Sequence, residues 1–232
     1  MPTGGVCASD QGNFDQPRVK LVVKRNMQAE FITMRNLQHA ICSAAAVFAA
    51  ATAQAENARL QLPVTVVEPR IAPYEAFCNR KPHACRLKGT TVIPMDKGLM
   101  GVLEQVNTDT NDDIGFALDR DIHGAEDFWT LPDSGYGDCE DIALEKRKRL
   151  TQLGYPTAAM RLALVFHDRH MSSHCVLTIE TDSGTFLMDS QDDRVLRWDR
   201  SPYHFESRER IDGLWDRFDQ ADWWSENGRG AP

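Results

Sequence analysis

Residues 136–153 read YGDCEDIALEKRKRLTQL, and this stretch decides the fold. Cys139 and Leu150 belong to an apolar series with helical spacing, while the charged run at positions 145–149 supplies a solvated face. The pattern predicts a helix over residues 139–153, which ends at the glycine and proline that follow it. A cysteine therefore opens a predicted helix.

The start of this helix is rich in carboxylates. Asp138 follows the break at Gly137 and occupies the N-cap position, with Asp141 three residues later, which approximates a capping box. Cys139 then lies in the first turn, where the helix dipole favours a thiolate. Asp138, Glu140 and Asp141 also have the oxygen ligands that calcium prefers. The residues leave capping and calcium binding open at this point.

A histidine follows on a predicted strand. Residues 161–166 and 174–180 have strand patterns, and alternation along the second places His174 and Cys175 on opposite faces. Cys175 is therefore interpreted as a buried thiol. His174 is left on the other face, together with Val176.

The third group depends on the hairpin after this strand. A turn between Thr181 and Asp182 places Asp189 directly opposite His174 on the same face. A turn centred on residues 183–184, the stronger local turn signal, gives that place to Asp193 instead.

Cys139, His174 and Asp189 have the chemistry of a nucleophile, a base and its orienting carboxylate. Each residue alone is ordinary, since most cysteines and strand histidines only pack. Together they predict cysteine-dependent acyl transfer. Glu140 and Asp141 oppose a thiolate, so a cationic His174 must supply much of the activation.

The predicted reaction is attack of the Cys139 thiolate on an amide carbonyl. His174 protonates the leaving amine and then activates water against the thioester. The backbone N–H of Cys139, at the helix start, is a candidate oxyanion donor. A transglutaminase or another acyltransferase would use the same triad with a different acceptor, and a non-catalytic periplasmic binding domain is the alternative from a different class.

With these motifs the chain resembles the bacterial transglutaminase-like cysteine peptidases, within the papain and transglutaminase fold group. The matching motifs are Phe77-Cys78 with Cys85, Trp129 and Pro132, Gly137-Asp138-Cys139-Glu140-Asp141, His174-Cys175-Val176-Leu177, and Met188-Asp189-Ser190. The block around Cys139 is specific in combination with the downstream histidine and aspartate.

The resemblance implies an α+β fold in which the nucleophile helix packs on an antiparallel sheet. It implies a periplasmic thiol peptidase with Cys139 as nucleophile, His174 as general base and acid, and Asp189 orienting the imidazole. No cofactor is required for this chemistry, but the resemblance implies calcium beside the nucleophile, at Asp138, Glu140 and Asp141. Some similar proteases release surface adhesins and are restrained by an inner-membrane receptor, so an adhesin substrate and such a receptor are the partners that the resemblance implies.

Residues 34–55 have the pattern of a signal peptide: a short basic start, an apolar core and Ala53-Gln54-Ala55 before Glu56. The core is shorter than the roughly 20 apolar residues of a membrane span. We expect a periplasmic mature chain, residues 56–232, that forms a single peptidase domain without a membrane span. Residues 1–33 are then an extension from a start assigned too far upstream. The alternative is a short buried alanine helix in a cytosolic protein.

The charge and the cysteines agree with this compartment. The formal net charge is −8, and removal of residues 1–55 makes the chain more acidic, which argues against nucleic-acid binding. In an oxidising compartment, Cys78 and Cys85 are close enough in sequence for a local disulfide. A zinc site that includes His83 is the alternative.

Other segments carry packing predictions. Asp96 caps a helix whose apolar residues, including Leu99 and Val106, recur at helical spacing. Prolines at positions 63, 69 and 73 predict an extended segment. Trp129 either walls the substrate cleft or packs in the core. The tryptophans of the tail either cover the core or contact a partner; these are Trp215, Trp223 and Trp224.

Overall fold

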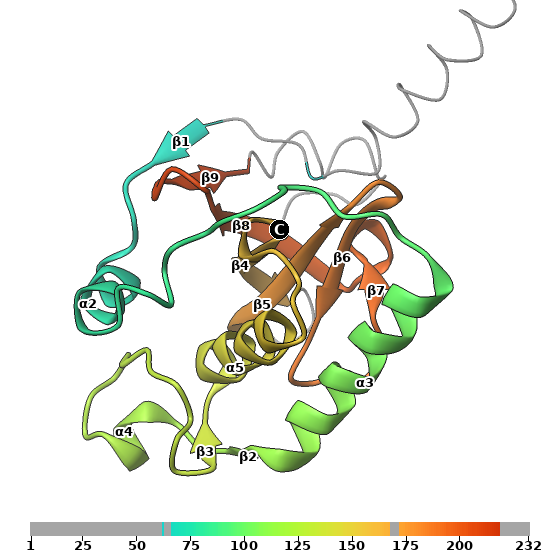
Figure 1. The fold of residues 1–232 in the computed structure, drawn as a ribbon. Helices are drawn as coiled ribbons and strands as arrows, with labels where there is room; N and C mark the ends of the chain where they lie inside the picture. The colour runs from blue at the N-terminus through green and yellow to red at the C-terminus, as the bar shows by residue number, and fades with distance from the viewer. Residues whose placement is uncertain (1–61, 63–65, 168–171, 219–232) are drawn as a thin grey trace, which may run out of the picture. The chain divides into compact units, whose positions relative to one another are not determined.

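The computed structural model describes Leu62, residues 66–167 and residues 172–218 (Figure 1). The predicted signal peptide at residues 34–55 and the extension at residues 1–33 lie outside the described residues, as do Trp223 and Trp224. Within the described segments, no helix combines the length and the apolar character that a bilayer crossing requires.

A seven-stranded sheet dominates the described structure, with the strand order β1-β9-β8-β4-β5-β6-β7 and antiparallel pairing throughout. The strands are β1 (Val66–Glu68), β4 (Met160–His167), β5 (Ser172–Thr181), β6 (Gly184–Met188), β7 (Leu196–Arg197), β8 (Tyr203–Glu209) and β9 (Trp215–Arg217). A separate parallel pair consists of β2 (Gly115–Phe116) and β3 (Tyr136–Gly137).

The helices of the described part are α2 (Ala72–Arg80), α3 (Lys97–Asp113), α4 (Asp119–Ile122) and α5 (Cys139–Gln152), with 3-10 turns η1 (Thr157–Ala159) and η2 (Trp198–Arg200). In Figure 1, α5 lies against the sheet, and it contacts both β5 and α3. This arrangement confirms the α+β prediction of a nucleophile helix packed on an antiparallel sheet.

The alternation predicted for β5 is confirmed by the two apolar clusters of the sheet. Cys175, Leu177 and Ile179 join the cluster that contains α3 and α5 side chains. Val176 belongs to the second cluster, with Phe205. Cys175 is a buried free thiol, as predicted.

Two helices were predicted well. α5 spans Cys139–Gln152, and Gly154 after it has a φ of 93°, a conformation that glycine adopts without strain. α3 begins after Asp96, whose side chain accepts a hydrogen bond from the backbone N–H of Leu99 at 2.7 Å. Capping of this helix start is therefore confirmed.

The extended segment predicted around the prolines is wrong in part, because Pro73 lies in the first turn of α2. Proline is tolerated there because its missing N–H would have no partner within the helix.

The solvated face predicted for residues 145–149 is also wrong in part. Glu145, Lys146 and Arg147 are buried. Arg147 forms a buried ion pair with Glu209, and its guanidinium also donates to Tyr74 Oη at 3.1 Å. The helix is covered on more than one side, and periodicity alone does not reveal that.

The hairpin register differs from both predicted turns. Thr181 pairs with Gly184 and Leu177 pairs with Met188, so the turn consists of Asp182 and Ser183. This register is displaced by two residues from the one that places Asp189 directly opposite His174. A shift of two residues keeps every side chain on its face, so Asp189 stays on the face of His174.

The remaining structural predictions concern cysteines and tryptophans. A disulfide joins Cys78 and Cys85, in place of the zinc alternative. Trp129 is buried and packs on Tyr74, with ring centroids 5.1 Å apart, so it takes the packing role. Trp215 packs on the same tyrosine at 5.6 Å and covers the core.

Leu150→Ala should lower the free energy of unfolding by about 3 kcal/mol, because Leu150 is fully buried and its loss leaves a cavity. Leu153→Ala, three residues further along, is the control. Its side chain is 61% exposed, and we expect a change of about 0.5 kcal/mol or less. Urea unfolding of both variants measures the difference, and equal effects would contradict the burial of this face.

Candidate active site

The structure brings His174 and Asp189 into direct contact. Nε2 of His174 lies 2.7 Å from Oδ1 of Asp189, and both side chains are buried. His174 comes from β5, and Asp189 follows directly after β6. Of the two predicted carboxylates, Asp189 is therefore the partner of His174. The other one, Asp193, accepts a hydrogen bond from Asn111.

Asp189 is held as an anion. Burial acts to raise the pKa of its carboxyl, but hydrogen bonds from His174, Tyr203 and the backbone N–H of Gln191, together with the charge of His174, lower it below the ordinary value. Since an ionised carboxylate only accepts hydrogen bonds, Nε2 of His174 must carry the proton. The tautomer of the ring is therefore set by Asp189.

Sequence reasoning missed Tyr203 of β8. Its hydroxyl donates to Oδ2 of Asp189, and its ring centroid lies 5.6 Å from that of His174. Burial, followed by the charge of Asp189, raises the pKa of Tyr203, so the hydroxyl stays protonated and remains a donor. Its sequence neighbourhood has no motif that marks it.

Cys139 is the first residue of α5 and lies next to β5. Its Sγ accepts a hydrogen bond from the backbone N–H of Cys175 at 3.3 Å, and its thiol donates to Oε2 of Glu140 at 3.1 Å. Cys175 is the residue directly after His174. The thiol is therefore fastened beside the strand that carries the imidazole.

The surroundings of Cys139 favour the protonated thiol. Burial raises the pKa of Cys139 well above the ordinary value, and the negative charge of Glu140 raises it further. The expectation that the helix start lowers this pKa is therefore not met in this conformation. Burial is the larger cause, and the carboxylate of Glu140, which accepts the thiol proton, adds the opposing effect anticipated from the sequence.

The capping interpretation of the helix start is wrong. Asp138 occupies the N-cap position, but its side chain makes no capping hydrogen bond, and its Oδ1 is buried without a partner. Asp141 instead accepts from the backbone N–H of Thr130 at 2.7 Å. Gly137 permits this arrangement, since a Cβ there would lie 2.7 Å from the Cβ of Asp141.

The carboxylates form a cluster with residues that sequence reasoning missed. Ligand atoms lie within 4.8 Å of one another in two sets: Asp119, His123 and Asp141 in one, and Asp119, Asp127 and Glu140 in the other. Asp119 and His123 belong to α4 and its C-cap, and Asp127 follows in the loop before Trp129. The only signal in the sequence was the high density of acidic residues between positions 119 and 127.

The cluster is electrostatically strained. Burial, followed by the charge of Asp138, raises the pKa of Glu140 to about 9. Burial also raises the pKa of Asp141 to about 8, with Asp138 and Asp119 adding to the effect. Three carboxylate oxygens are buried without a hydrogen-bond donor: Asp119 Oδ1, Asp138 Oδ1 and Asp141 Oδ2. Unpartnered buried oxygens close together fit a hard cation.

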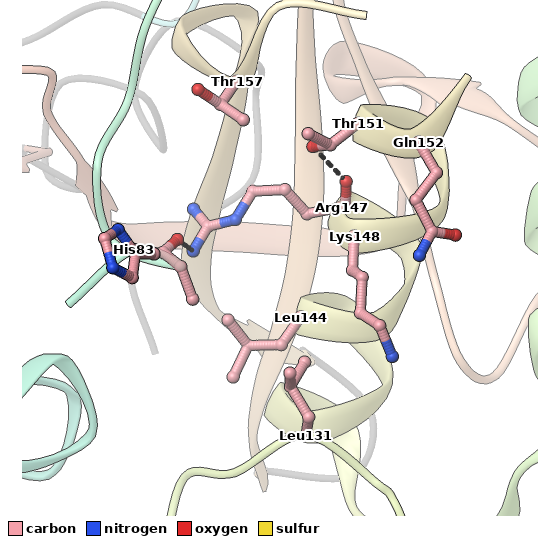
Figure 2. A pocket seen from close by; sticks show the side chains of 9 residues that line it. His83, Leu131, Leu144, Arg147, Lys148, Thr151, Gln152 and Thr157 are labelled. Carbon is pink, nitrogen blue, oxygen red and sulfur yellow. Dashed lines mark hydrogen bonds between the residues drawn. The ribbon is translucent and has the colours of Figure 1, made fainter. Parts of the chain in front are cut away.

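A cavity of about 270 Å³ lies beside α5 (Figure 2). Leu131, Leu144 and Lys148 line it, and Arg147 reaches across it to donate to the carbonyl of Ala84 at 3.1 Å. Cys139, His174 and Asp189 are not among its lining residues. The candidate active site is therefore distinct from this cavity.

Residues 65–223 match the family described as bacterial transglutaminase-like cysteine proteinase, BTLCP. The match covers more than half of the chain, so the chain belongs to this family and is a cysteine peptidase. No curated protein matches the chain.

Solved structures of Legionella pneumophila LapG are similar to the chain. The calcium-bound form is 22% identical with a TM-score of 0.45, over 65% of this chain and 98% of that chain. The EGTA-treated form is 23% identical with a TM-score of 0.45, over 66% of this chain and 89% of that chain.

In calcium-free buffer at pH 10, where Glu140 is ionised because its pKa is about 9, Glu140→Gln should increase the rate of Cys139 alkylation by about tenfold. The variant removes the negative charge that stabilises the thiol proton, so the pKa of Cys139 falls and more thiolate is present. Mass spectrometry after brief treatment with iodoacetamide measures the rate. Glu145→Gln is the control, because Glu145 pairs with Lys148 and Arg149 instead. An unchanged or slower rate for Glu140→Gln would refute this assignment.

Proposed function

We propose that the chain is a periplasmic cysteine peptidase that cleaves peptide bonds through Cys139, His174 and Asp189. One observation carries the proposal: the buried His174–Asp189 pair is connected to Cys139 through the hydrogen bond from Cys175 N–H to Sγ. Acyl transfer needs a base whose tautomer is fixed and a nucleophile held close to it. Here the nucleophile is held by the strand residue that follows the base.

In this mechanism Asp189 engages Nε2 of His174, so Nδ1 is the ring nitrogen that remains for the thiol. His174 accepts the proton of Cys139, and the thiolate attacks the carbonyl carbon. Nδ1 then returns the proton to the leaving amine as the thioester forms. The backbone N–H of Cys139 at the start of α5 is positioned to donate to the oxyanion. Water completes the cycle by hydrolysing the thioester.

We further propose that the acidic cluster binds calcium. Asp119, Asp127 and Glu140 would hold the ion with their carboxylate oxygens, Asp141 would add another oxygen from the second set, and Asp138 lies at the same helix start. Of the three ligands that the sequence predicted, Glu140 belongs to one set and Asp141 to the other, whereas Asp138 belongs to neither. Bound there, calcium supplies positive charge that offsets the buried carboxylates. Glu140, once engaged by a cation, would no longer favour the protonated form of Cys139.

The compartment and the partners complete the proposal. The signal-peptide pattern at residues 34–55 and the disulfide between Cys78 and Cys85 support a periplasmic peptidase formed by residues 56–232. A peptidase requires a protein substrate. A surface adhesin as that substrate, and an inner-membrane receptor as regulator, rest on the resemblance of the motifs to the adhesin-releasing proteases.

His174→Ala should abolish rapid alkylation of Cys139, because the thiolate then has no cationic partner. Mass spectrometry of iodoacetamide-treated protein across the pH range, with calcium present, measures the loss. His83→Ala is the matched control, since His83 is exposed beside the cavity of Figure 2 and should leave the rate unchanged. If the wild-type protein is alkylated slowly, and at the same rate as His174→Ala, a non-catalytic binding domain is the better proposal. If alkylation depends on His174, amine and water acceptors distinguish a transglutaminase from a peptidase.

Without calcium, the free energy of unfolding should fall as pH rises from 5 to 9, by about 1 kcal/mol per pH unit for each of two carboxyls at the steepest point. The folded-state pKa of Asp141 (about 8) and that of Glu140 (about 9) are raised. At low pH both carboxyls are protonated in the folded and the unfolded state, and they do not change the free energy of unfolding. Above the unfolded-state pKa the protein loses stability progressively, and the loss is complete above the folded-state pKa.

Urea unfolding at several pH values, with chelator or with calcium chloride, tests this linkage. Calcium should remove most of the decrease, and Glu140→Gln should reduce the decrease seen with chelator. Stability that is flat with pH in chelator and indifferent to calcium would exclude a cation site at this cluster.

A further inference from the structure

Lys146 is a buried cation that the mechanism above does not use. Its side chain is fully buried on α5, two helical turns after Cys139 and therefore on the same side of the helix. Its Nζ has no hydrogen-bond partner among the described residues. A buried charge is unfavourable unless opposite charge compensates it, so the surroundings of this ammonium are informative.

The carboxylates that act on Lys146 are Asp189 and Asp193, whose charges favour its protonated form. They lie at the two ends of residues 189–193, the segment that carries the partner of His174. α3 fastens this segment from the other side through neutral amides. Asn111 donates to Asp189 O at 3.0 Å and to Asp193 Oδ1 at 2.8 Å, and Asn107 donates to Asp192 O at 2.8 Å.

The same region contains buried acceptors that lack donors. The unpartnered atoms are Asn107 Oδ1, Asn111 Oδ1 and Ser190 Oγ. An ammonium group has three N–H donors and no acceptor, so Lys146 is the complement of this set. Asn107 and Asn111 belong to α3, which packs against α5, the helix that carries Lys146.

We propose that Lys146 is a positioning residue for the His174–Asp189 pair: its ammonium holds residues 189–193 against α5 and keeps the Asp189 carboxylate ionised and in place. The inference rests on the proposed function of that pair. Hydrogen bonds from His174, Tyr203 and Gln191 orient the carboxylate group, whereas Lys146 supplies a full positive charge from the nucleophile helix itself.

The charge of Lys146 changes within the working pH range. Burial lowers the pKa of Lys146 to about 7, although Asp189 and Asp193 oppose the decrease. The ammonium is therefore present at pH 6 and mostly absent at pH 8.5. Asp189 and Asp193 are the charged groups that favour the ammonium form of Lys146, and Asp189 in turn contacts His174 and Tyr203.

Lys146→Met, which removes the charge at similar size, tests the inference through the pH dependence of Cys139 alkylation with calcium present. At pH 6 the variant should react about tenfold more slowly than the unmodified chain, because Asp189 and His174 lose their support. At pH 8.5 the ratio should approach one, because the unmodified Lys146 has itself lost its charge. The urea midpoint of the variant should be unchanged or higher, since a buried ammonium without a hydrogen-bond partner is replaced by an apolar side chain.

Three further variants make the outcome decisive. Lys146→Gln is a second neutral variant for the case in which the methionine variant does not fold, and it should show the same loss at pH 6. Lys146→Arg keeps the charge at both pH values and should restore the rate at pH 6. Lys148→Met removes a partly exposed charge from the same helix and should change neither rate.

A ratio that stays constant between pH 6 and pH 8.5, or a rate that simply follows the urea midpoint, would overturn the positioning role. His174→Ala, measured in parallel, distinguishes a failure of the proposed function from a failure of the inference about Lys146. If alkylation of the unmodified chain does not depend on His174, the proposed function fails. If it does depend on His174 while Lys146→Met and Lys146→Gln match the unmodified chain at pH 6, only the inference about Lys146 fails.

Discussion

The hydrogen bond from the backbone N–H of Cys175 to Sγ of Cys139 joins the start of α5 to β5. It places the thiol beside the residue that follows His174, so one contact aligns the helix that carries the nucleophile with the strand that carries the base. The pairing of β5 with β6 and the contact of β4 with β8 then bring Asp189 and Tyr203 to the same imidazole. The rest of the site depends on α5 remaining packed on this sheet.

Charge is distributed unevenly along α5. The first turn carries Glu140 and Asp141, to which α4 and its following loop add Asp119 and Asp127. Burial raises the pKa values of Glu140 and Asp141, and the charge of Asp138 raises both further. The middle of the helix buries the cations Lys146 and Arg147. Arg147 forms an ion pair with Glu209, whereas Lys146 makes no hydrogen bond within the described residues and is influenced by the charges of Asp189 and Asp193. The thiol is buried at the negative end, and burial, followed by the charge of Glu140, raises the pKa of Cys139 and keeps its proton in place.

Much of the secondary structure was predictable because it depends on local periodicity. The limits of α5, the capped start of α3 and the alternation of β5 follow from spacing and from the residue at the helix start. The disulfide was predictable because Cys78 and Cys85 lie close together in the sequence. The hairpin register was not predictable, because several polar residues at positions 181–184 suit a turn, and cross-strand packing selects among them. Asp189 remained the partner of His174 because the error was an even number of residues.

The sequence by itself determined the order of the chemical groups, the helix that begins at Cys139, the face of β5 on which His174 lies, and the acidic start of α5. These properties depend on a few neighbouring residues. Only the tertiary structure decided that Asp138 does not cap, that Asp119 and Asp127 join the carboxylates of α5, that Tyr203 holds Asp189, and that Lys146 is buried. Each of these depends on segments distant in sequence that bury one another, and burial changes both the partners and the charge of a side chain.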